Sequence, residues 1–407
     1  MRIATRRLLL LPATATLAAC ATAGSGASSP ATSAPAAAAT NVAAADRGAF
    51  VVRLGSDTVS VERYTRTGSR IEGDQVFRAP ATTMRHYVAT LGPNGAITAL
   101  DFDSRRAAGG APPTRAELRL GADTSTVRVV SGQRDTTLRF AARGLLPYLN
   151  LTYGLMEAII ASQLRPGSDS AAVSFVGVGA TEPIKGTIRR VGSDSVTFAV
   201  FEPNPYRARV DAQGRILGLQ GLATTQKVIV ERVSDVDVQG IAAAWARRDS
   251  SGQALGTLSP ADSVKATVGS ANLSVVYSRP SLRGRSLMGF LIPYGQVWRT
   301  GANAATMFTT SRDLVINGTT VPAGSYTLWT LANANGGAQL IINRQTGQWG
   351  TDYDASRDLA RLNATVTTLP TPVERFTFAI EPNAGGSGGT IKYMWGDRQF
   401  AVPFTVK

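Results

Sequence analysis

The chain has 407 residues, of which 43% are hydrophobic and 17% charged, a composition typical of a globular protein with two or three domains. Its formal net charge is +14, but the basic residues are spread along the chain without a Lys/Arg block or an interleaved aromatic platform, which argues against a nucleic-acid partner. One cysteine and one histidine exclude disulfide staples, thiolate or histidine-rich zinc sites, and haem attachment.

The N-terminus carries a targeting pattern. Three arginines, Arg2, Arg6 and Arg7, precede an apolar stretch over residues 8–17 that is too short to span a bilayer as a helix. The run Leu17-Ala18-Ala19-Cys20 follows, and the whole segment resembles a bacterial lipoprotein signal peptide. The resemblance implies removal of residues 1–19, which would lower the net charge to about +11, and attachment of lipid, including palmitate, to Cys20. The alternatives are an ordinary signal peptide with a chance cysteine, or a buried cysteine.

A lipid on Cys20 implies an exported protein of the cell envelope that reaches the membrane through this anchor. Ala21 follows the cysteine, where Asp would favour the inner membrane in many Gram-negative bacteria, so we expect anchoring in the outer membrane, facing the periplasm or the surface. Residues 20–45 consist almost entirely of Ala, Ser, Thr, Gly and Pro and predict a flexible tether. Association of the basic chain with anionic lipid head groups is a further alternative.

Residues 46–255 predict an antiparallel β domain, because short alternating runs at 50–54, 58–64 and 86–91 are separated by turn residues. Apolar residues at helical spacing predict one helix near 145–164 lying across the sheet, and a second short helix is possible over 238–248. This pattern resembles the open, half-closed barrels of periplasmic lipoprotein carriers. Two short sequence motifs recur in this region: residues 55–61 resemble 192–198, and residues 92–100 resemble 211–219. This recurrence indicates either similar hairpin turns or a duplication.

After a polar linker over 249–259, residues 265–407 predict a second β domain. Short strands punctuated by Gly and Pro favour a β-sandwich or a jelly roll. The expected strands cover residues 273–277, 306–310, 314–316, 325–331, 339–343, 376–380, 390–395 and 400–406.

Four segments of this second domain carry a family resemblance. They are the runs at residues 276–285, 293–303, 322–328 and 348–354, which include Trp298-Arg299-Thr300-Gly301. Together, in this order, they resemble the bacterial domain-of-unknown-function family 2911, a resemblance that implies no activity. The family pattern tends to place a Glu after Asn303, whereas this chain has Ala304.

The same segments supply the predicted ligand-binding residues. Trp298, Arg299 and Asn303 combine an aromatic face, a guanidinium and an amide, which suits a sugar or a carboxylate. In the alternative, Trp298 packs in the core and Arg299 pairs with Asp352 or Asp354. The rest of the predicted set is Tyr277, Arg279, Trp349 and Asp354.

We predict no catalytic residue, no metal and no cofactor. His86 lies within a strand and no Gly-x-Ser-x-Gly motif is present, so a histidine-based hydrolase is not expected. Asp354 is expected to cap a short helix over 355–362 together with Ser356, in preference to a calcium loop. The leading hypothesis is a non-catalytic module that binds a glycan, a lipid or an envelope protein. The alternatives are a structural envelope protein or a carbohydrate hydrolase using paired carboxylates among Glu62, Asp101, Asp352 and Asp354.

Overall fold

The computed structural model describes residues 46–141, 143–164, 167–200 and 204–407, and these residues are mainly β. The N-terminal half carries one large mixed sheet of fifteen strands, and the C-terminal part carries an antiparallel sheet of ten strands. The predicted signal peptide, Cys20 and the tether lie outside the described residues. Within the four ranges, no helix is both long enough and apolar enough to cross a membrane.

The large sheet consists of two meanders that meet at its centre. The first meander comprises β1 (Asp46–Leu54), β2 (Asp57–Thr67), β3 (Arg70–Phe77), β4 (Thr83–Leu91), β5 (Ile97–Arg106), β6 (Thr114–Leu120), β7 (Ser125–Ser131) and β8 (Arg134–Phe140). The later strands are β9 (Leu145–Tyr148), β10 (Ser170–Gly177), β11 (Ile184–Val191), β12 (Ser195–Val200), β13 (Tyr206–Val210), β14 (Ile216–Gln220) and β15 (Ile229–Val233). β15 pairs with β1 and joins the meanders. Because β9 runs parallel to β10, the sheet is mixed and not wholly antiparallel as predicted.

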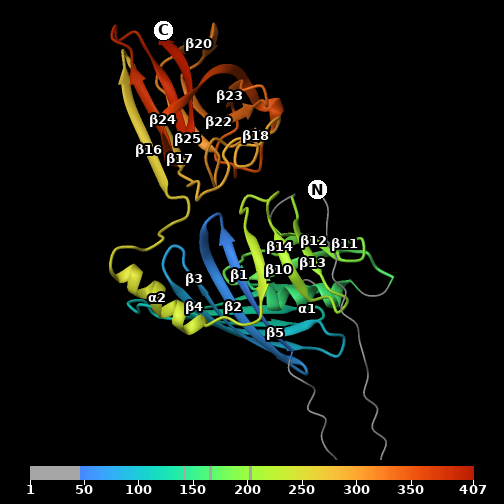
Figure 1. The fold of residues 1–407 in the computed structure, drawn as a ribbon. Coiled ribbons are helices and arrows are strands. Elements are labelled where there is room, and N and C mark those ends of the chain that lie inside the picture. Colours follow the sequence, from blue (N-terminus) through green and yellow to red (C-terminus); the bar gives the residue numbers. More distant parts are fainter. Residues whose placement is uncertain (1–45, 142, 165–166, 201–203) are drawn as a thin grey trace, which may run out of the picture. The chain divides into compact units, whose positions relative to one another are not determined.

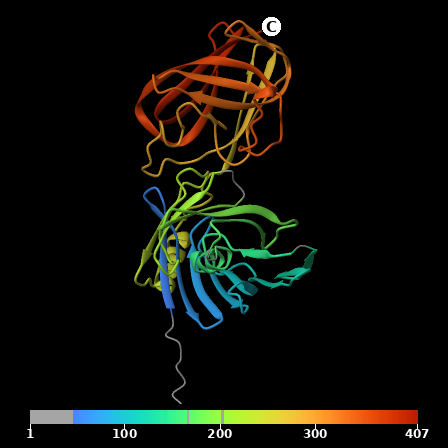
Figure 2. The same cartoon turned by 90° about the vertical axis from the view of Figure 1, so that its right-hand side faces the viewer.

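The helix α1 (Tyr153–Gln163) lies against one face of this sheet, between strands of the two meanders (Figure 1). Figure 2 shows the helix end-on, with strands of both meanders curving around it. Most of its residues are buried, and they share one hydrophobic core with strands from both meanders. The edge strands β8 and β9 do not pair with each other, so the sheet is open and is not a closed barrel.

The predicted helix near 145–164 is too long, because only Tyr153–Gln163 is helical. Residues 145–148 form the strand β9, and the helix begins only at Tyr153. The reason is local: Pro147 cannot occupy the interior of a helix, and Leu151 adopts a positive φ of 62° that ends the connecting turn. Apolar residues on both sides of this break gave the appearance of one continuous helical period.

A second helix, α2 (Val238–Ser250), confirms the short helix expected over 238–248. Asp237 caps it by accepting the N–H of Gly240 at 2.9 Å. Its buried residues Val238, Ala242 and Trp245 pack on Val61 and Val76, on the face of β2 and β3 that points away from α1.

The ten-stranded sheet confirms the predicted strands of the second domain. Its strands are β16 (Ala261–Val268), β17 (Ala271–Ser278), β18 (Val297–Trp298), β19 (Thr306–Thr310), β20 (Leu314–Ile316), β21 (Thr319–Val321), β22 (Gly324–Ala332), β23 (Ala338–Asn343), β24 (Asp358–Pro382) and β25 (Gly388–Val406). The prediction of a helix over 355–362 is wrong: Asp354 does cap with Ser356, but only the 3-10 turn η1 (Ala355–Arg357) forms. β24 begins at Asp358 because this segment pairs with β23.

Candidate functional site

A row of polar side chains crosses the inner face of the large sheet beneath the start of α1. Strand pairing aligns five residues across neighbouring strands, and Phe50 is the one apolar member of this row. In order they are Arg232, Phe50, Glu62, Gln75 and Arg85. Polar residues in a sheet interior must find partners, because an unpaired buried polar group costs about 1–3 kcal/mol. Each member of this row meets the helix or the turn that leads into it.

Glu62 caps the N-terminus of α1 from the sheet. Its side chain is fully buried and accepts the N–H groups of Tyr153 at 2.5 Å and Gly154 at 3.2 Å. The Tyr87 hydroxyl donates a third hydrogen bond to it at 2.5 Å. The residue before the helix, Thr152, makes no side-chain cap, so Glu62 supplies the missing acceptor. Burial outweighs these donors and raises the pKa of Glu62 to about 7.

Gln75 and Arg85 hold the turn that precedes α1. The Gln75 amide donates to the carbonyl of Leu151 at 2.6 Å, and the Arg85 guanidinium donates to the carbonyl of Asn150 at 3.1 Å. Arg85 also lies over the ring of Phe77, 4.0 Å from its centroid. Together with Glu62, these contacts fix the position and direction of the helix relative to the sheet.

Glycines make room for the tyrosines of this centre. A Cβ on Gly73 would lie 2.4 Å from the Tyr87 ring, and one on Gly154 would lie 2.6 Å from the Tyr64 ring. Both distances are far inside van der Waals contact. The helix and the strand therefore approach the two rings closely only because these positions lack a side chain.

The second carboxylate of the centre belongs to α1 itself. One oxygen of Glu157 accepts from Arg232 at 2.8 Å and from the N–H of Ile216 at 2.7 Å, and the other accepts from the Tyr64 hydroxyl. The side chains of Glu157 and Arg232 are only 10% and 14% exposed. The Arg232 guanidinium also covers the ring of Phe50, at 5.1 Å from its centroid. Burial, more than any neighbour, raises the pKa of Glu157 above its ordinary value.

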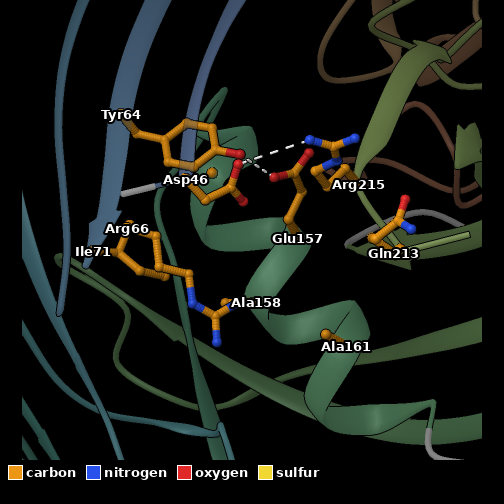
Figure 3. A pocket seen from close by; sticks show the side chains of 11 residues that line it. Asp46, Tyr64, Arg66, Ile71, Glu157, Ala158, Ala161, Gln213 and Arg215 are labelled. Carbon is orange, nitrogen blue, oxygen red and sulfur yellow. Dashed lines mark hydrogen bonds and ion pairs between the residues drawn. The ribbon is translucent and has the colours of Figure 1, made fainter. Parts of the chain in front are cut away.

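A cavity of about 260 Å³ opens beside this pair, between α1 and the strands. Figure 3 shows Tyr64 and Glu157 at one end and small helix residues along one wall. The side chains along this wall are small, because Gly154, Ala158 and Ala161 recur at helical spacing on one side of α1. The lining residues are Asp46, Tyr64, Arg66, Ile71, Gly154, Glu157, Ala158, Ala161, Gln213, Gly214 and Arg215.

The two arginines that line the cavity differ in their ion pairs. Arg215 binds Asp211 at 2.7 Å and lies 3.9 Å from Asp46, so it is neutralised from two sides. Arg66 extends from β2 toward the helix (Figure 3) and makes no ion pair with any residue in the described ranges. The cavity thus combines one guanidinium without an ion pair, a second arginine, the carboxylates of Asp46 and Glu157, and a partly apolar wall.

The predicted ligand residues of the second domain divide into two groups. Trp298 and Tyr277 lie in the core: Trp298 stacks on Trp395 with 5.8 Å between ring centroids, and Tyr277 meets Phe378 edge-on at 4.9 Å. Arg299 donates to the carbonyl of Asn303 at 3.0 Å, across a tight turn.

Beside that turn, Trp349 pairs with Ala304 and leaves 53% of its surface exposed. The amide of Asn303 donates to the Ser278 hydroxyl at 3.3 Å. The structure therefore brings Arg299, Asn303 and Trp349 together, with Trp298 on the core side of them. Their role in binding remains a prediction.

The two remaining predicted residues lie elsewhere in the same domain. Arg279, which follows β17, donates to Asp262 at 2.9 Å and to the Thr377 hydroxyl at 2.7 Å, and so ties the end of β17 to its partner β16 and to β24. Asp354 caps η1 and is exposed.

The C-terminal part of the chain is similar to a known family. Residues 259–404 match the family of unknown function DUF2911. No curated protein matches the chain. Among solved structures, a DUF1089 family protein from Pseudomonas aeruginosa is similar at 15% identity and a TM-score of 0.32, over 42% of this chain and 93% of that one. A β-barrel-like DUF1849 protein from Brucella abortus is similar at 12% identity and a TM-score of 0.32, over 46% and 94%.

Of the carboxylates considered for hydrolysis, Glu62 and Asp101 lie on opposite faces of the large sheet. Glu62 is buried beneath α1, whereas Asp101 on β5 binds Arg119 on the opposite, exposed face of the sheet at 2.6 Å. Asp352 and Asp354 belong to the DUF2911 domain. His86 lies in β4, where Asp74 is 2.9 Å from its Nδ1. Across the described ranges, no three His, Cys, Asp or Glu side chains are grouped as a metal site would require.

Sequence reasoning missed the centre formed by Glu157, Arg232 and Tyr64. One signal was available: Glu157 is the only charged residue within the apolar segment 145–164. A lone carboxylate in a buried helix needs a buried cation or a hydrogen-bond donor. The position of that cation, Arg232 on β15, depends on the closure of the second meander onto β1 and has no local sequence signal.

Proposed function

We propose that this protein is a lipid-anchored envelope protein whose N-terminal domain binds a small anionic amphiphile in the cavity beside α1. The observation that carries the proposal is the unmatched Arg66 in a cavity with a partly apolar wall. A carboxylate or a phosphate monoester would satisfy the guanidinium, and a short apolar group would contact Ile71, Ala158 and Ala161. At about 260 Å³ the cavity suits a small ligand.

The burial and hydrogen bonding of Glu62 and Glu157 support ligand binding over catalysis. Glu62 is fully buried, and both oxygens of Glu157 already accept hydrogen bonds from Tyr64, Arg232 and the Ile216 N–H. A general base needs a free lone pair within reach of the substrate proton. Glu62 does not line the cavity and Glu157 is already held by three donors, so we assign both groups to organising the site and not to proton transfer.

Binding can be tested with three probes that share one chain length: hexanoate, hexyl phosphate and uncharged hexanol. We expect both anions to bind and hexanol to bind more weakly in isothermal titration. Arg66→Gln should weaken anion binding about 10-fold to 100-fold, since a hydrogen bond to a charged group contributes about 1.5–3 kcal/mol. Its effect on hexanol should be small.

The matched control is Arg63→Gln on the same strand. Arg63 points to the other face, where Asp74 lies 4.0 Å away, so this variant should bind the anions as the parent does. Equal losses in both variants, or no anion binding by the parent, would contradict the proposal.

Lipid attachment at Cys20 is the second part of the proposal, and it rests on the basic N-terminus, the short apolar stretch and the run that ends in Cys20. In cells of a Gram-negative host, we expect the parent chain to fractionate with outer membranes and to incorporate labelled palmitate. Cys20→Ser should abolish the label and release the protein into the soluble fraction. A Cys20→Ser protein that still incorporates the label would exclude this assignment.

We further propose that the DUF2911 domain is a second binding module built as two packed layers. Its core joins residues of the first strands, such as Leu273, Phe308 and Leu340, to Phe376 and Tyr393 of the long final hairpin, which supports a sandwich-like arrangement. Trp349, with Arg299 and Asn303 beside it, is the part of the predicted ligand set that faces solvent, and a glycan suits an exposed aromatic face.

A further inference from the structure

One face of the large sheet carries basic side chains without acidic partners. On the outer face of β11 and β13, the exposed basic residues are Lys185, Arg189, Arg207 and Arg209. None of the four forms an ion pair with another described residue. Of the acids in this region, Asp169 lies 3.8 Å from Arg190, Glu231 on β15 pairs with Arg53, and Asp194 lies in the β11–β12 turn beside Ser195, the register partner of Arg209.

Strand register brings the four cations together. Thr197 on β12 pairs with Arg189 on one side and with Arg207 on the other, so these arginines stand two strand spacings apart, roughly 10 Å. Arg209 follows Arg207 by two residues on the same face, and Lys185 precedes Arg189 by four. The result is a compact basic patch, which we call the β11–β13 patch, formed by Lys185, Arg189, Arg207 and Arg209.

The first meander shows that this arrangement is not general for the sheet. Its outer face is also rich in arginine, and four of these arginines have an acid beside them. Arg119 binds Asp101 at 2.6 Å and Arg128 binds Asp135 at 2.7 Å. Arg115 lies 3.5 Å from Asp103 and Arg63 4.0 Å from Asp74. These four arginines are therefore neutralised, whereas the four basic residues of the β11–β13 patch form no ion pair with a described residue.

Apolar side chains accompany the β11–β13 patch. Val191, on the same face of β11 as Arg189, is 36% exposed. Ile229 is 39% exposed and lies in register with Gln220, which in turn pairs with Arg207. A surface that mixes unmatched cations with exposed aliphatic groups suits the boundary between lipid head groups and acyl chains.

We infer that the β11–β13 patch docks on an anionic membrane surface through lipid phosphate groups. Docking through this patch depends neither on the proposed lipid anchor nor on the proposed cavity ligand. If Cys20 does carry lipid, the roughly 26 residues of tether could span up to about 90 Å when extended, at ~3.3–3.6 Å per residue, so they would permit this contact.

The test uses the chain from residue 20 onward with Cys20→Ser, so that no lipid is attached, and measures sedimentation with vesicles. We expect binding to phosphatidylcholine vesicles that contain phosphatidylglycerol, weak binding to pure phosphatidylcholine, and loss of binding in high salt. The fourfold variant K185Q/R189Q/R207Q/R209Q should bind the anionic vesicles at least 10-fold more weakly, since each basic residue near such a surface contributes about fivefold.

The matched control removes the same charge from the first meander, as R63Q/R115Q/R119Q/R128Q. It should retain most of the vesicle binding, because those arginines are neutralised by acids. Equal losses in the two fourfold variants would show that net charge alone drives binding and would overturn the inference. Absence of binding by the parent, or tighter binding to a DNA oligonucleotide than to the anionic vesicles, would also overturn it. Circular dichroism confirms that each variant is folded.

Discussion

Replacing Arg232 with methionine is expected to lower the free energy of unfolding of the N-terminal domain by about 3–5 kcal/mol at neutral pH, the range found when one partner of a buried ion pair is removed. Methionine retains apolar contact with Phe50 and Tyr64, over which the guanidinium lies. It leaves Glu157, only 10% exposed, without its cation. Native-state hydrogen exchange of peptides from β2 and β15 reports the stability of this domain separately from the DUF2911 domain.

Two comparisons separate the lost ion pair from a packing defect. At about pH 5 the penalty of Arg232→Met should be smaller, because an unpaired Glu157 takes up a proton more readily in the folded state. The double variant Arg232→Met/Glu157→Met should recover part of the stability, since it removes both charges. Arg53→Met, whose exposed partner Glu231 lies 3.5 Å away, should change the stability by less than about 1 kcal/mol. A penalty that is independent of pH and of Glu157 would indicate packing instead.

The sequence predicted the class of the fold because its signals are local. Alternation, Gly turns and Pro breaks identify strands and hairpins one at a time, and nearly every predicted strand is present. The two recurring motifs illustrate the limit of such signals. In the first meander they form the turns β1–β2 and β4–β5, three strands apart, whereas in the second they form β11–β12 and β13–β14, two apart. A simple duplication would preserve that spacing, so repeated hairpin chemistry explains the echo better.

Local sequence patterns could not predict the candidate site, because strand β2 is buried on both faces. In the run from Val59 to Tyr64, alternation alone would direct Val61 to the core and Glu62 to solvent. In the structure Val61 packs under α2, and Glu62 lies under α1. Which face receives which helix is decided by contacts far apart in the sequence. Polar residues on the inner face could therefore not be recognised before the helices were placed.

Lowering the pH from about 7 to about 5 is expected to stabilise the N-terminal domain, which is the opposite of ordinary acid denaturation. Burial raises the pKa of Glu62 from 4.5 to about 7, so the folded state keeps this proton up to about pH 7 while the unfolded chain loses it above 4.5. Between these values the folded state binds more protons, and stability falls as pH rises. At about 1.4 kcal/mol per pKa unit, Glu62 accounts for roughly 3 kcal/mol across that window. Glu157, whose pKa is also raised by burial, contributes in the same direction.

Glu62→Gln isolates this effect, because glutamine does not titrate. The variant should be less stable overall, since its amide cannot accept from Tyr153, Gly154 and Tyr87 as the carboxyl group does, but the stability that remains should vary much less between pH 5 and 7. Glu72→Gln on the neighbouring strand is the control: its side chain is 47% exposed, so the parent pH dependence should persist. Hydrogen exchange of β2 and α1 across the pH series measures both. Stability that rises with pH in the parent would mean that the helix N–H donors keep Glu62 ionised in the folded protein, with the cap acting as a buried charge at the end of α1.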